Sequence, residues 1–181
     1  MQYLIIFETG EGQTRKIVTF VERQIMSAGH KVRIYNSEGR PAGLSFDDID
    51  KVVLAAPVHE RRHPKDFEGV VSAHLEELKA RPTLLLSISL KAAFSEGLEE
   101  AQDYLIEMKM RTGFNPDHEA LIAGAVRTQA YGYFESQVVQ YVLLEGRDVN
   151  IIDGIREFTD WDQLVAISAS FLSENTRWYE P

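Results

Sequence analysis

The sequence contains no cysteine among its 181 residues. This absence excludes disulfide bonds, thiolate nucleophiles and cysteine-ligated metal sites. Any redox chemistry that the protein performs must therefore come from a bound cofactor rather than from its own side chains.

Long hydrophobic runs are also missing. No apolar stretch approaches the roughly 18 residues that a membrane-spanning helix needs, and the first residues lack the pattern of a secretion leader. We therefore expect a cytoplasmic protein. Basic residues are in deficit too, since 19 Lys and Arg stand against 28 Asp and Glu, which gives a net charge of −9. This balance disfavours nonspecific nucleic-acid binding and suits docking on a basic protein partner.

The remaining composition is that of a soluble globular protein, with 44% hydrophobic and 26% charged residues. A chain of this length buries about 70% of its unfolded surface as one domain of ordinary size. We therefore interpret residues 1–181 as a single domain.

The first thirty residues organise the rest of the chain. Residues 3–7 are an almost unbroken apolar run, which is typical of a strand buried on both faces of a parallel sheet. The polar turn of residues 9–14 follows, and then a helical pattern ends at Gly29, a natural C-cap. The apolar stripe of that helix is formed by Ile17, Val18, Val21 and Ile25. The chain thus opens with a strand, a tight turn and a helix.

Apolar runs and helical patterns then alternate along the chain. This alternation predicts an α/β fold with a doubly wound, five-stranded parallel sheet and right-handed crossovers. Between the second and third strands we expect a short helix or none, with a turn at residues 46–49. The later strands are predicted at residues 31–36, 51–56, 83–88 and 120–126, and the later helices at residues 64–80, from Ser95 to about residue 111, and from Thr159 onward.

Two details of the helices are predicted from their ends and stripes. Ser95 and Thr159 are good N-caps, and the carboxylate of Asp162 three residues after Thr159 resembles a capping box. His74 lies on the apolar side of its helix and is interpreted as a residue at the edge of the core. In the last helix the residues expected to pack inward are Leu164, Val165, Ile167, Ala169 and Leu172.

Residues 127–158 do not fit a minimal fold of this kind, and we interpret them as an insertion after the fifth strand. Aromatic and aliphatic residues at 131–144 predict an amphipathic helix there. The sequence leaves open whether that helix meets a membrane, a second copy of the chain or its own sheet edge. The tail at residues 175–181, with Trp178 and Tyr179, is expected either to dock on the body or to stay exposed.

The turn at residues 9–14 is expected to bind an anion. The first turn of a helix leaves backbone N–H groups unpaired at the positive end of the helix dipole. Gly10 and Gly12 allow close approach or positive φ, and the hydroxyls of Thr9 and Thr14 can donate to phosphate oxygens. The alternative is an ordinary strand-to-helix turn in which Glu11 pairs with Arg15.

The pattern of this turn narrows the choice of phosphate ligand. The dinucleotide fingerprint needs a third glycine at position 15, where Arg15 stands, and the nucleoside-triphosphate loop needs Gly-Lys-Ser/Thr. The hydroxyl-x-x-Gly-x-Thr pattern that remains resembles the FMN phosphate loop of flavodoxins. That resemblance implies the strand order 2-1-3-4-5, with the ligand between the loops after strands one, three and four. The expected cofactor-binding residues are Thr9, Gly10, Glu11, Gly12, Gln13, Thr14, Pro57, Val58, His59, Ser87, Ser89, Leu90, Lys91 and Ala92.

The loop after the third strand is basic within an acidic protein, because it carries His59, Arg61, Arg62 and His63. These residues are either exposed loop charges or a recognition site for an acidic substrate. Metal binding by His59 and His63 is not expected, since Pro64 follows and they do not share a helix face. Lys91 is either a solvated loop lysine or a cation beside the flavin, where it would stabilise the reduced ring.

Taken together, the pieces resemble the bacterial menaquinone-dependent protoporphyrinogen oxidases, a flavodoxin-fold family of heme biosynthesis. The resemblance rests on residues 5–9 running into 12–17, on residues 124–127, on the insertion with Tyr131 and on residues 159–163. It implies an FMN oxidoreductase that removes hydrogens from a porphyrinogen and passes electrons to a membrane quinone, with peripheral contact at the inner membrane and self-association left open. The substrate-binding residues implied are Arg61, His63, Arg127 and Tyr131.

Two departures from that family keep other functions open. Glu11 stands where a neutral residue is usual, and the insertion has Arg127 as its only cation before Arg147. One alternative is a flavodoxin-type electron carrier that docks through its acidic surface. The other is a flavodoxin-shaped interaction protein without flavin.

Overall fold

A computed structural model of the chain describes residues 1–127 and 155–174. The predicted aromatic helix at residues 131–144, Tyr131 within it, and the tail with Trp178 and Tyr179 lie outside the described residues.

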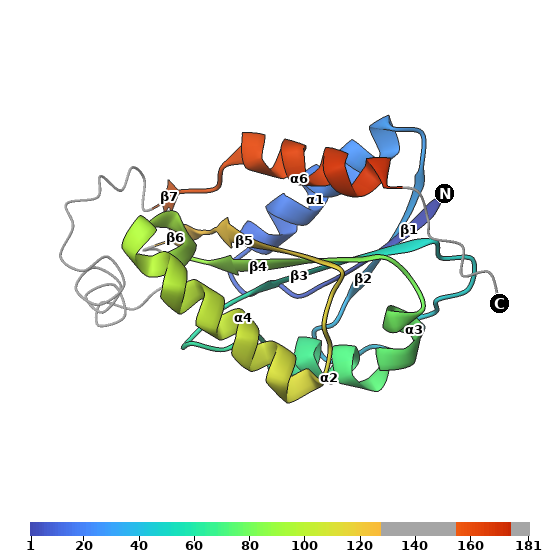
Figure 1. Cartoon of the computed structure of the whole chain (residues 1–181), viewed down its shortest axis with the longest axis horizontal. Coiled ribbons are helices and arrows are strands. Elements are labelled where there is room, and N and C mark those ends of the chain that lie inside the picture. The colour runs from blue at the N-terminus through green and yellow to red at the C-terminus, as the bar shows by residue number, and fades with distance from the viewer. Residues whose placement is uncertain (128–154, 175–181) are drawn as a thin grey trace.

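The core of the fold is one five-stranded parallel sheet (Figure 1). Its strands are β1 (Gln2–Phe7), β2 (Lys31–Asn36), β3 (Lys51–Pro57), β4 (Thr83–Ser89) and β5 (His118–Ala123). Their order across the sheet is β2-β1-β3-β4-β5, and every neighbouring pair is parallel. The predicted order is confirmed, and it places the point where the strand order reverses between β1 and β3.

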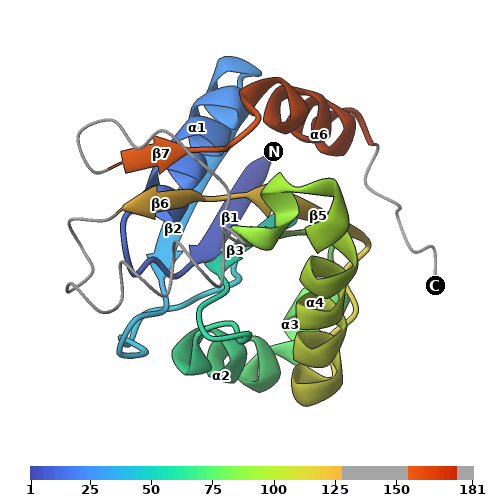
Figure 2. The ribbon, with the colours of Figure 1, turned by 90° about the vertical axis from the view of Figure 1, so that its left-hand side faces the viewer.

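Helices cover both faces of this sheet (Figures 1 and 2). One face carries α1 (Gln13–Ser27) and α6 (Trp161–Ser173), and the other carries α2 (Lys65–Ala73), α3 (Leu75–Lys79) and α4 (Leu98–Thr112). Residues 37–50 between β2 and β3 form no helix, and the predicted turn there is closed by a bond from the Ile49 amide to the Phe46 carbonyl. Two short 3₁₀ turns, η1 (Lys91–Ala93) and η2 (Ser95–Gly97), follow β4.

The alternation of side chains along β1 divides the core into two layers. Tyr3, Ile5 and Phe7 pack toward α1 and α6, whereas Leu4 and Ile6 pack toward α2 and α4. All five are fully buried, which explains why this strand is an apolar run rather than an alternating pattern. The four residues predicted as the stripe of the first helix are also buried.

The single helix predicted for residues 64–80 is wrong in one respect, because it breaks at His74 into α2 and α3. His74 has φ −121° and ψ 33°, outside the helical region. Its ring packs 5.3 Å from that of Phe46, and its Nδ1 lies 3.5 Å from Glu77 Oε1. This contact with a distant turn outweighs the local helical pattern, and His74 lies at the core edge as expected.

The fifth apolar run also divides, at Gly124. β5 ends at Ala123, and residues 125–127 form β6 (Ala125–Arg127), which pairs antiparallel with β7 (Ile155–Glu157) in a separate two-stranded sheet (Figure 2). The Gly124 amide donates to the Ser89 carbonyl, and its carbonyl accepts from the Phe158 amide. The chain therefore leaves the main sheet at this glycine.

The two predicted N-caps are wrong. α4 begins after Gly97, because Ser95 starts η2 instead, and α6 is capped by Asp160, whose carboxylate accepts from the Gln163 amide at 3.0 Å. Within α6, Leu164 is buried and Ile167 and Leu172 pack against the core, but Val165 and Ala169 are exposed. The Thr159 hydroxyl is used elsewhere, in the site described next.

Candidate functional site

A cavity lies where the carboxyl ends of β1, β3, β4 and β5 meet. Its volume is about 80 Å³, and it is partly open to solvent. Eight of the predicted cofactor-binding residues line it, together with four residues that were not predicted. The full lining is Glu11, Gln13, Thr14, Pro57, Val58, His59, Ile88, Ser89, Leu90, Gly124, Ala125 and Val126. The cavity thus joins four segments that are distant in sequence.

One wall of the cavity is the start of α1. Gly12 precedes the helix with φ 90°, a left-handed conformation that glycine adopts without strain. Its amide donates to Thr9 Oγ1 at 3.1 Å, which leaves the Thr9 hydroxyl proton available to a ligand. The amides of Gln13, Thr14 and Arg15 belong to the first helical turn, whose N–H groups have no partner within the helix. The wall is therefore built to bind an anion.

Gln13 is fixed in one orientation at this wall. The side chain is 6% exposed, and its Nε2 donates to Thr159 Oγ1 at 2.8 Å. The Thr159 hydroxyl proton is already committed to the Ala123 carbonyl, also at 2.8 Å, so Thr159 can only accept from Gln13. Gln13 Oε1 is left buried, with no hydrogen-bond donor among the described residues. The site therefore offers a spare acceptor, which suits a ligand hydroxyl.

Glu11 and His59 approach each other beside this wall. His59 Nδ1 lies 3.9 Å from Glu11 Oε1. The ring also lies over the first loop, because a Cβ on Gly10 would come 3.3 Å from His59 Nε2. A larger residue than glycine at position 10 would therefore require a small shift of the His59 ring.

The two cations of the first helical turn have partners within the protein. Lys16 forms an ion pair with Glu157 and lies over the Trp161 ring, and the Arg15 guanidinium lies 4.4 Å from the centroid of the Phe7 ring.

The loop after β3 contains a strained two-residue turn. The amides and carbonyls of His59 and Arg62 bond each other, both at 2.9 Å, and the residues between them have positive φ: 46° for Glu60 and 64° for Arg61. Non-glycine residues in this region each cost about 1 to 2 kcal/mol. Side-chain contacts that hold this turn in place therefore matter for its conformation.

His63 ends the loop, and its interpretation as part of an exposed basic loop is wrong. The side chain is 1% exposed, and its Nε2 lies 2.9 Å from Ser87 Oγ. Burial lowers the pKa of His63 to about 4, with the nearby Glu68 opposing the shift. A buried neutral imidazole presents no charge to a substrate. Ser87 is likewise buried against His63 and does not line the cavity, and its predicted role stays a prediction.

Arg62 is also paired with a carboxylate inside the protein. Its Nη2 lies 2.6 Å from Glu68 Oε2, and the same buried carboxylate accepts from Arg111 at 2.8 Å. Of the four basic residues in the loop, Arg61 and His59 have the most exposed side chains, at 61% and 48% respectively. The loop therefore offers less free positive charge than its sequence indicates.

The loop after β4 forms the opposite wall. Ser89 Oγ accepts from the Ala92 amide at 3.2 Å, which curls the chain into η1. The interpretation of Lys91 as a solvated lysine is wrong, since its side chain is 14% exposed and its Nζ lies 3.0 Å from Glu100 Oε2. Gly97 closes the loop tightly, because a Cβ there would lie 2.4 Å from the Lys91 carbonyl oxygen.

Four lining residues escaped prediction: Ile88, Gly124, Ala125 and Val126. Gly124 carried a usable signal, since an isolated glycine inside an apolar run marks a bend or a close backbone approach. A Cβ at this position would lie 3.3 Å from Ile88 Cγ2. For the substrate-binding predictions, Tyr131 lies outside the described residues and Arg127 is placed only as the last residue of β6.

Within residues 1–127 and 155–174, no three His, Asp or Glu side chains gather as a metal site. None of the helices in these same ranges combines the length and hydrophobicity needed to cross a bilayer.

The sequence of this chain is similar to one protein family and to several known proteins. A family model described as "Flavodoxin domain" matches residues 4–149. The protoporphyrinogen IX dehydrogenase [quinone] of Escherichia coli (strain K12) is 25% identical over 166 residues, which cover 91% of both chains. A protein of the same name from Leishmania major is 24% identical over 175 residues, 93% of this chain and 73% of the relative.

Solved structures agree on the fold. The oxidised flavodoxin 1 from Bacillus cereus superposes with a TM-score of 0.55 at 13% identity, covering 97% of this chain and 99% of that one. The Fusobacterium nucleatum flavodoxin bound to flavin mononucleotide gives a TM-score of 0.50 at 12% identity, with 95% of both chains covered.

Proposed function

The chain belongs to the flavodoxin domain family, and from that premise we propose that it binds FMN and acts as an oxidoreductase on a porphyrinogen-like substrate with a quinone as electron acceptor. The observation that carries the proposal is the similarity over 91% of both chains to a protein named for that reaction. The cavity at the point where the strand order reverses supplies the place where such a cofactor would bind.

The residues at the cavity fit FMN. The first-turn amides of α1 and the hydroxyls of Thr9 and Thr14 would hold the phosphate, which carries the negative charge that a helix N-terminus favours. The spare acceptor of Gln13 suits a hydroxyl of the ribityl chain. Apolar side chains of Val58, Ile88 and Leu90 line the walls between which a flat ring would lie.

When bound, FMN would supply the redox chemistry, taking hydrogens from the reduced substrate and giving electrons to the quinone. The protein's own residues bind, orient and keep water from the apolar walls. No side chain needs to act as an acid or base, because positioning is what the protein contributes. Arg61, which has the most exposed side chain of the basic loop, remains our candidate for binding an acidic group of the substrate.

Two experiments test this function. Apoprotein titrated with FMN should bind it, and Thr14→Ala and Gly12→Asp should each weaken binding, whereas Thr19→Ala on the outer side of the same helix should not. FMN-loaded protein should convert protoporphyrinogen to its fluorescent product without oxygen when a menaquinone analogue is added. A rate no greater than the chemical background would refute the enzymatic proposal.

Particular observations favour two other candidates. The net charge of −9 favours an electron carrier, which would show salt-dependent electron exchange with a reductase. The carboxylate of Glu11 at the cavity wall favours an interaction protein that binds no flavin, because a carboxylate repels a phosphate. A yellow preparation with flavin absorbance would eliminate the second candidate.

A membrane quinone would require the protein to reach the bilayer surface. We therefore propose a cytoplasmic protein that makes peripheral contact with the inner membrane. Flotation with anionic vesicles tests this contact, and a protein that stays in the soluble fraction at low salt would contradict it.

A further inference from the structure

Both loops that border the cavity after β3 and β4 carry a cation just beyond the lining residues. These cations are Arg61 and Lys91, and both reach the same carboxylate. That carboxylate belongs to Glu100, the third residue of α4, which has no contact with the cavity itself.

Each oxygen of Glu100 has a separate partner. Oε1 accepts from Arg61 Nη1 at 2.6 Å and from the Tyr104 hydroxyl, and Oε2 lies 3.0 Å from Lys91 Nζ. The Arg61 guanidinium also lies 5.2 Å from the centroid of the Tyr104 ring. The hydrogen bond from Tyr104 and the two cations lower the pKa of Glu100, so the carboxylate is charged at neutral pH.

The ion pairs of Glu100 help to hold the strained turn after β3. Arg61 occupies the second positive-φ position of that turn, and His59, the residue that opens the turn, lines the cavity. Glu68 holds the turn through Arg62, and Glu100 holds it through Arg61. Since Glu100 also holds Lys91, one residue after the lining residue Leu90, it connects the two facing walls.

The same carboxylate sets the charge of the walls. Arg61 and Lys91 contribute two positive charges, and Glu100 cancels one of them. Without Glu100, the loops would present more positive potential, which favours the reduced and more negative state of a nearby flavin.

We propose that Glu100 is a positioning residue of the FMN site, which holds the loops after β3 and β4 in their relative places and limits the positive charge that they present. This inference rests on the proposed flavin binding. It assigns a role to a residue outside the cavity, on a helix that the cofactor-binding prediction did not include.

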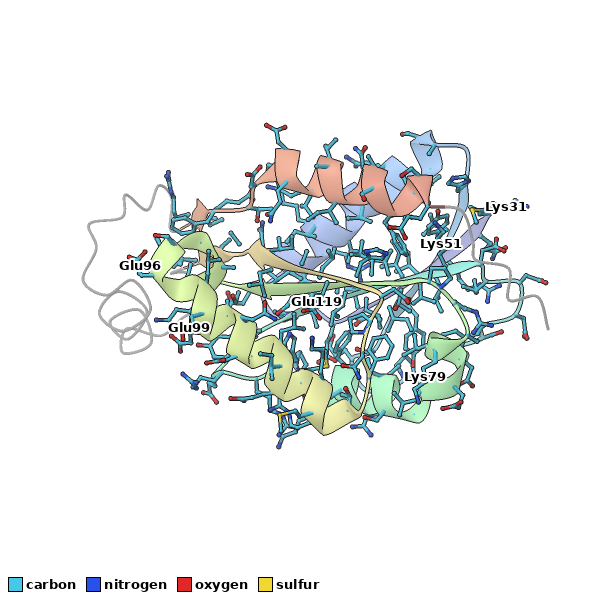
Figure 3. All side chains as sticks on the ribbon, in the orientation of Figure 1. Lys31, Lys51, Lys79, Glu96, Glu99 and Glu119 are labelled. Atoms are coloured by element: carbon cyan, nitrogen blue, oxygen red, sulfur yellow. The ribbon has the colours of Figure 1, made fainter. Side chains whose placement is uncertain are left out.

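The test compares Glu100→Gln with Glu99→Gln. Glu99 is exposed and lies in the same first turn of α4 (Figure 3), so both changes remove one negative charge from the same helix end. Two quantities are measured: the dissociation constant of FMN from apoprotein, and the midpoint potential of the bound flavin. Circular dichroism confirms that each variant is folded, and Arg61→Gln, which breaks one arm of the contact, provides a second variant.

Glu100→Gln should weaken FMN binding by about three- to tenfold, the range for a network of partly exposed ion pairs, and should shift the flavin potential to a more positive value. Glu99→Gln should change neither quantity. A double-mutant cycle of Glu100→Gln with Lys91→Met should show coupling in both measurements.

Three outcomes are decisive. Wild-type protein that binds no flavin overturns the proposed function, and this inference with it. Wild-type protein that binds flavin, with Glu100→Gln indistinguishable from Glu99→Gln, overturns the inference alone. Weaker binding without a change in potential contradicts the charge-limiting role and leaves Glu100 a structural residue.

Discussion

The two ends of the parallel sheet are built from different chemistry. At the amino end, where the strands start, Lys51, Thr83 and Asp117 are hydrogen-bonded to neighbouring elements. At the carboxyl end, where the strands stop, there are a strained turn, a cavity, a buried histidine and clustered charges. The comparison teaches that one set of strands can serve two purposes: stability at one end and, in our proposal, ligand binding at the other.

Lys51 illustrates the amino end. It is the first residue of β3 and is fully buried, yet its Nζ donates to the carbonyls of Phe171 and Glu174 at 2.7 and 2.6 Å. Those carbonyls belong to the end of α6, where a helix leaves acceptors unpaired. Thr83 and Asp117 form a similar closed arrangement at the start of β4, with three mutual hydrogen bonds of 2.8 to 3.0 Å. The amino end therefore secures the outer elements to the sheet.

The first prediction has the largest expected effect and tests whether the two ends of the sheet are independent. Lys51→Ala removes the stem of a buried side chain and leaves two helix-end carbonyls unpaired, which should cost about 4 kcal/mol of unfolding free energy. Denaturant unfolding measures this loss. Lys31→Ala, at the exposed first residue of β2 (Figure 3), should cost less than about 0.5 kcal/mol. FMN affinity of folded Lys51→Ala should match that of the wild type, and a loss there would show that the two ends are not independent.

The second prediction concerns pH and the carboxyl end. The pKa of His63 is about 4 in the folded protein and about 6.5 in an unfolded chain, so neutral His63 contributes stability that is complete above pH 6.5. This contribution is lost as the pH falls toward 4 and amounts to about 3 kcal/mol. Urea unfolding of the wild type and His63→Gln at several pH values should show curves that converge in acid. His74→Gln controls for the loss of a histidine, and parallel wild-type and His63→Gln curves would contradict the prediction.

The third prediction sharpens the comparison at the loop after β4. Gly97→Ala would place a Cβ 2.4 Å from the Lys91 carbonyl, so the loop must move away from its place beside the cavity. We expect FMN to bind about tenfold more weakly, which corresponds to about 1.4 kcal/mol. Fluorescence quenching of FMN measures the affinity. Ser95→Ala, an exposed change in the same loop, should leave binding unaltered, and equal affinities for the two variants would show that the loop tolerates the shift.

The smallest predicted effect is a gain. Glu11→Gln removes the negative charge from the cavity wall and should strengthen FMN binding by about threefold at low salt. The gain should shrink as salt is added, because the repulsion is screened. Glu60→Gln removes a charge from the neighbouring loop outside this cavity and serves as the control. If Glu11→Gln binds FMN more weakly, the contact with His59 matters more than the repulsion.

Much of the fold was predictable because its signals are local. The apolar run of β1 and the stripe of α1 follow from burial on both faces and on one face, respectively, and the strand order follows from the resemblance to flavodoxins. The break at His74 was not predictable in the same way, because it depends on contact with Phe46, which lies 28 positions earlier in the chain. The cap of α6 was misplaced by one residue because Thr159 and Asp160 are both good caps and a tertiary bond engages Thr159.

The candidate site was also predictable only where its signals are local in the sequence. The geometry of the first loop was predictable from its glycines and hydroxyls, because these residues favour a tight turn before a helix. The second loop was not, because four basic residues in sequence give no indication that His63 is buried and Arg62 is paired with Glu68. Residue type indicates charge, whereas burial and pairing decide how much of that charge is available.

The pairing of β6 with β7 has a practical consequence for engineering. Arg127 and Ile155 are direct partners in this antiparallel pair, so their Cα atoms are about 4.5 to 5.5 Å apart. A two-residue Asn-Gly hairpin turn could therefore replace residues 128–154 without a gap in the chain. Thr159 follows β7 and would keep its bond to Gln13 in such a shortened protein. The cavity and the segment between the paired strands could then be studied and exchanged separately.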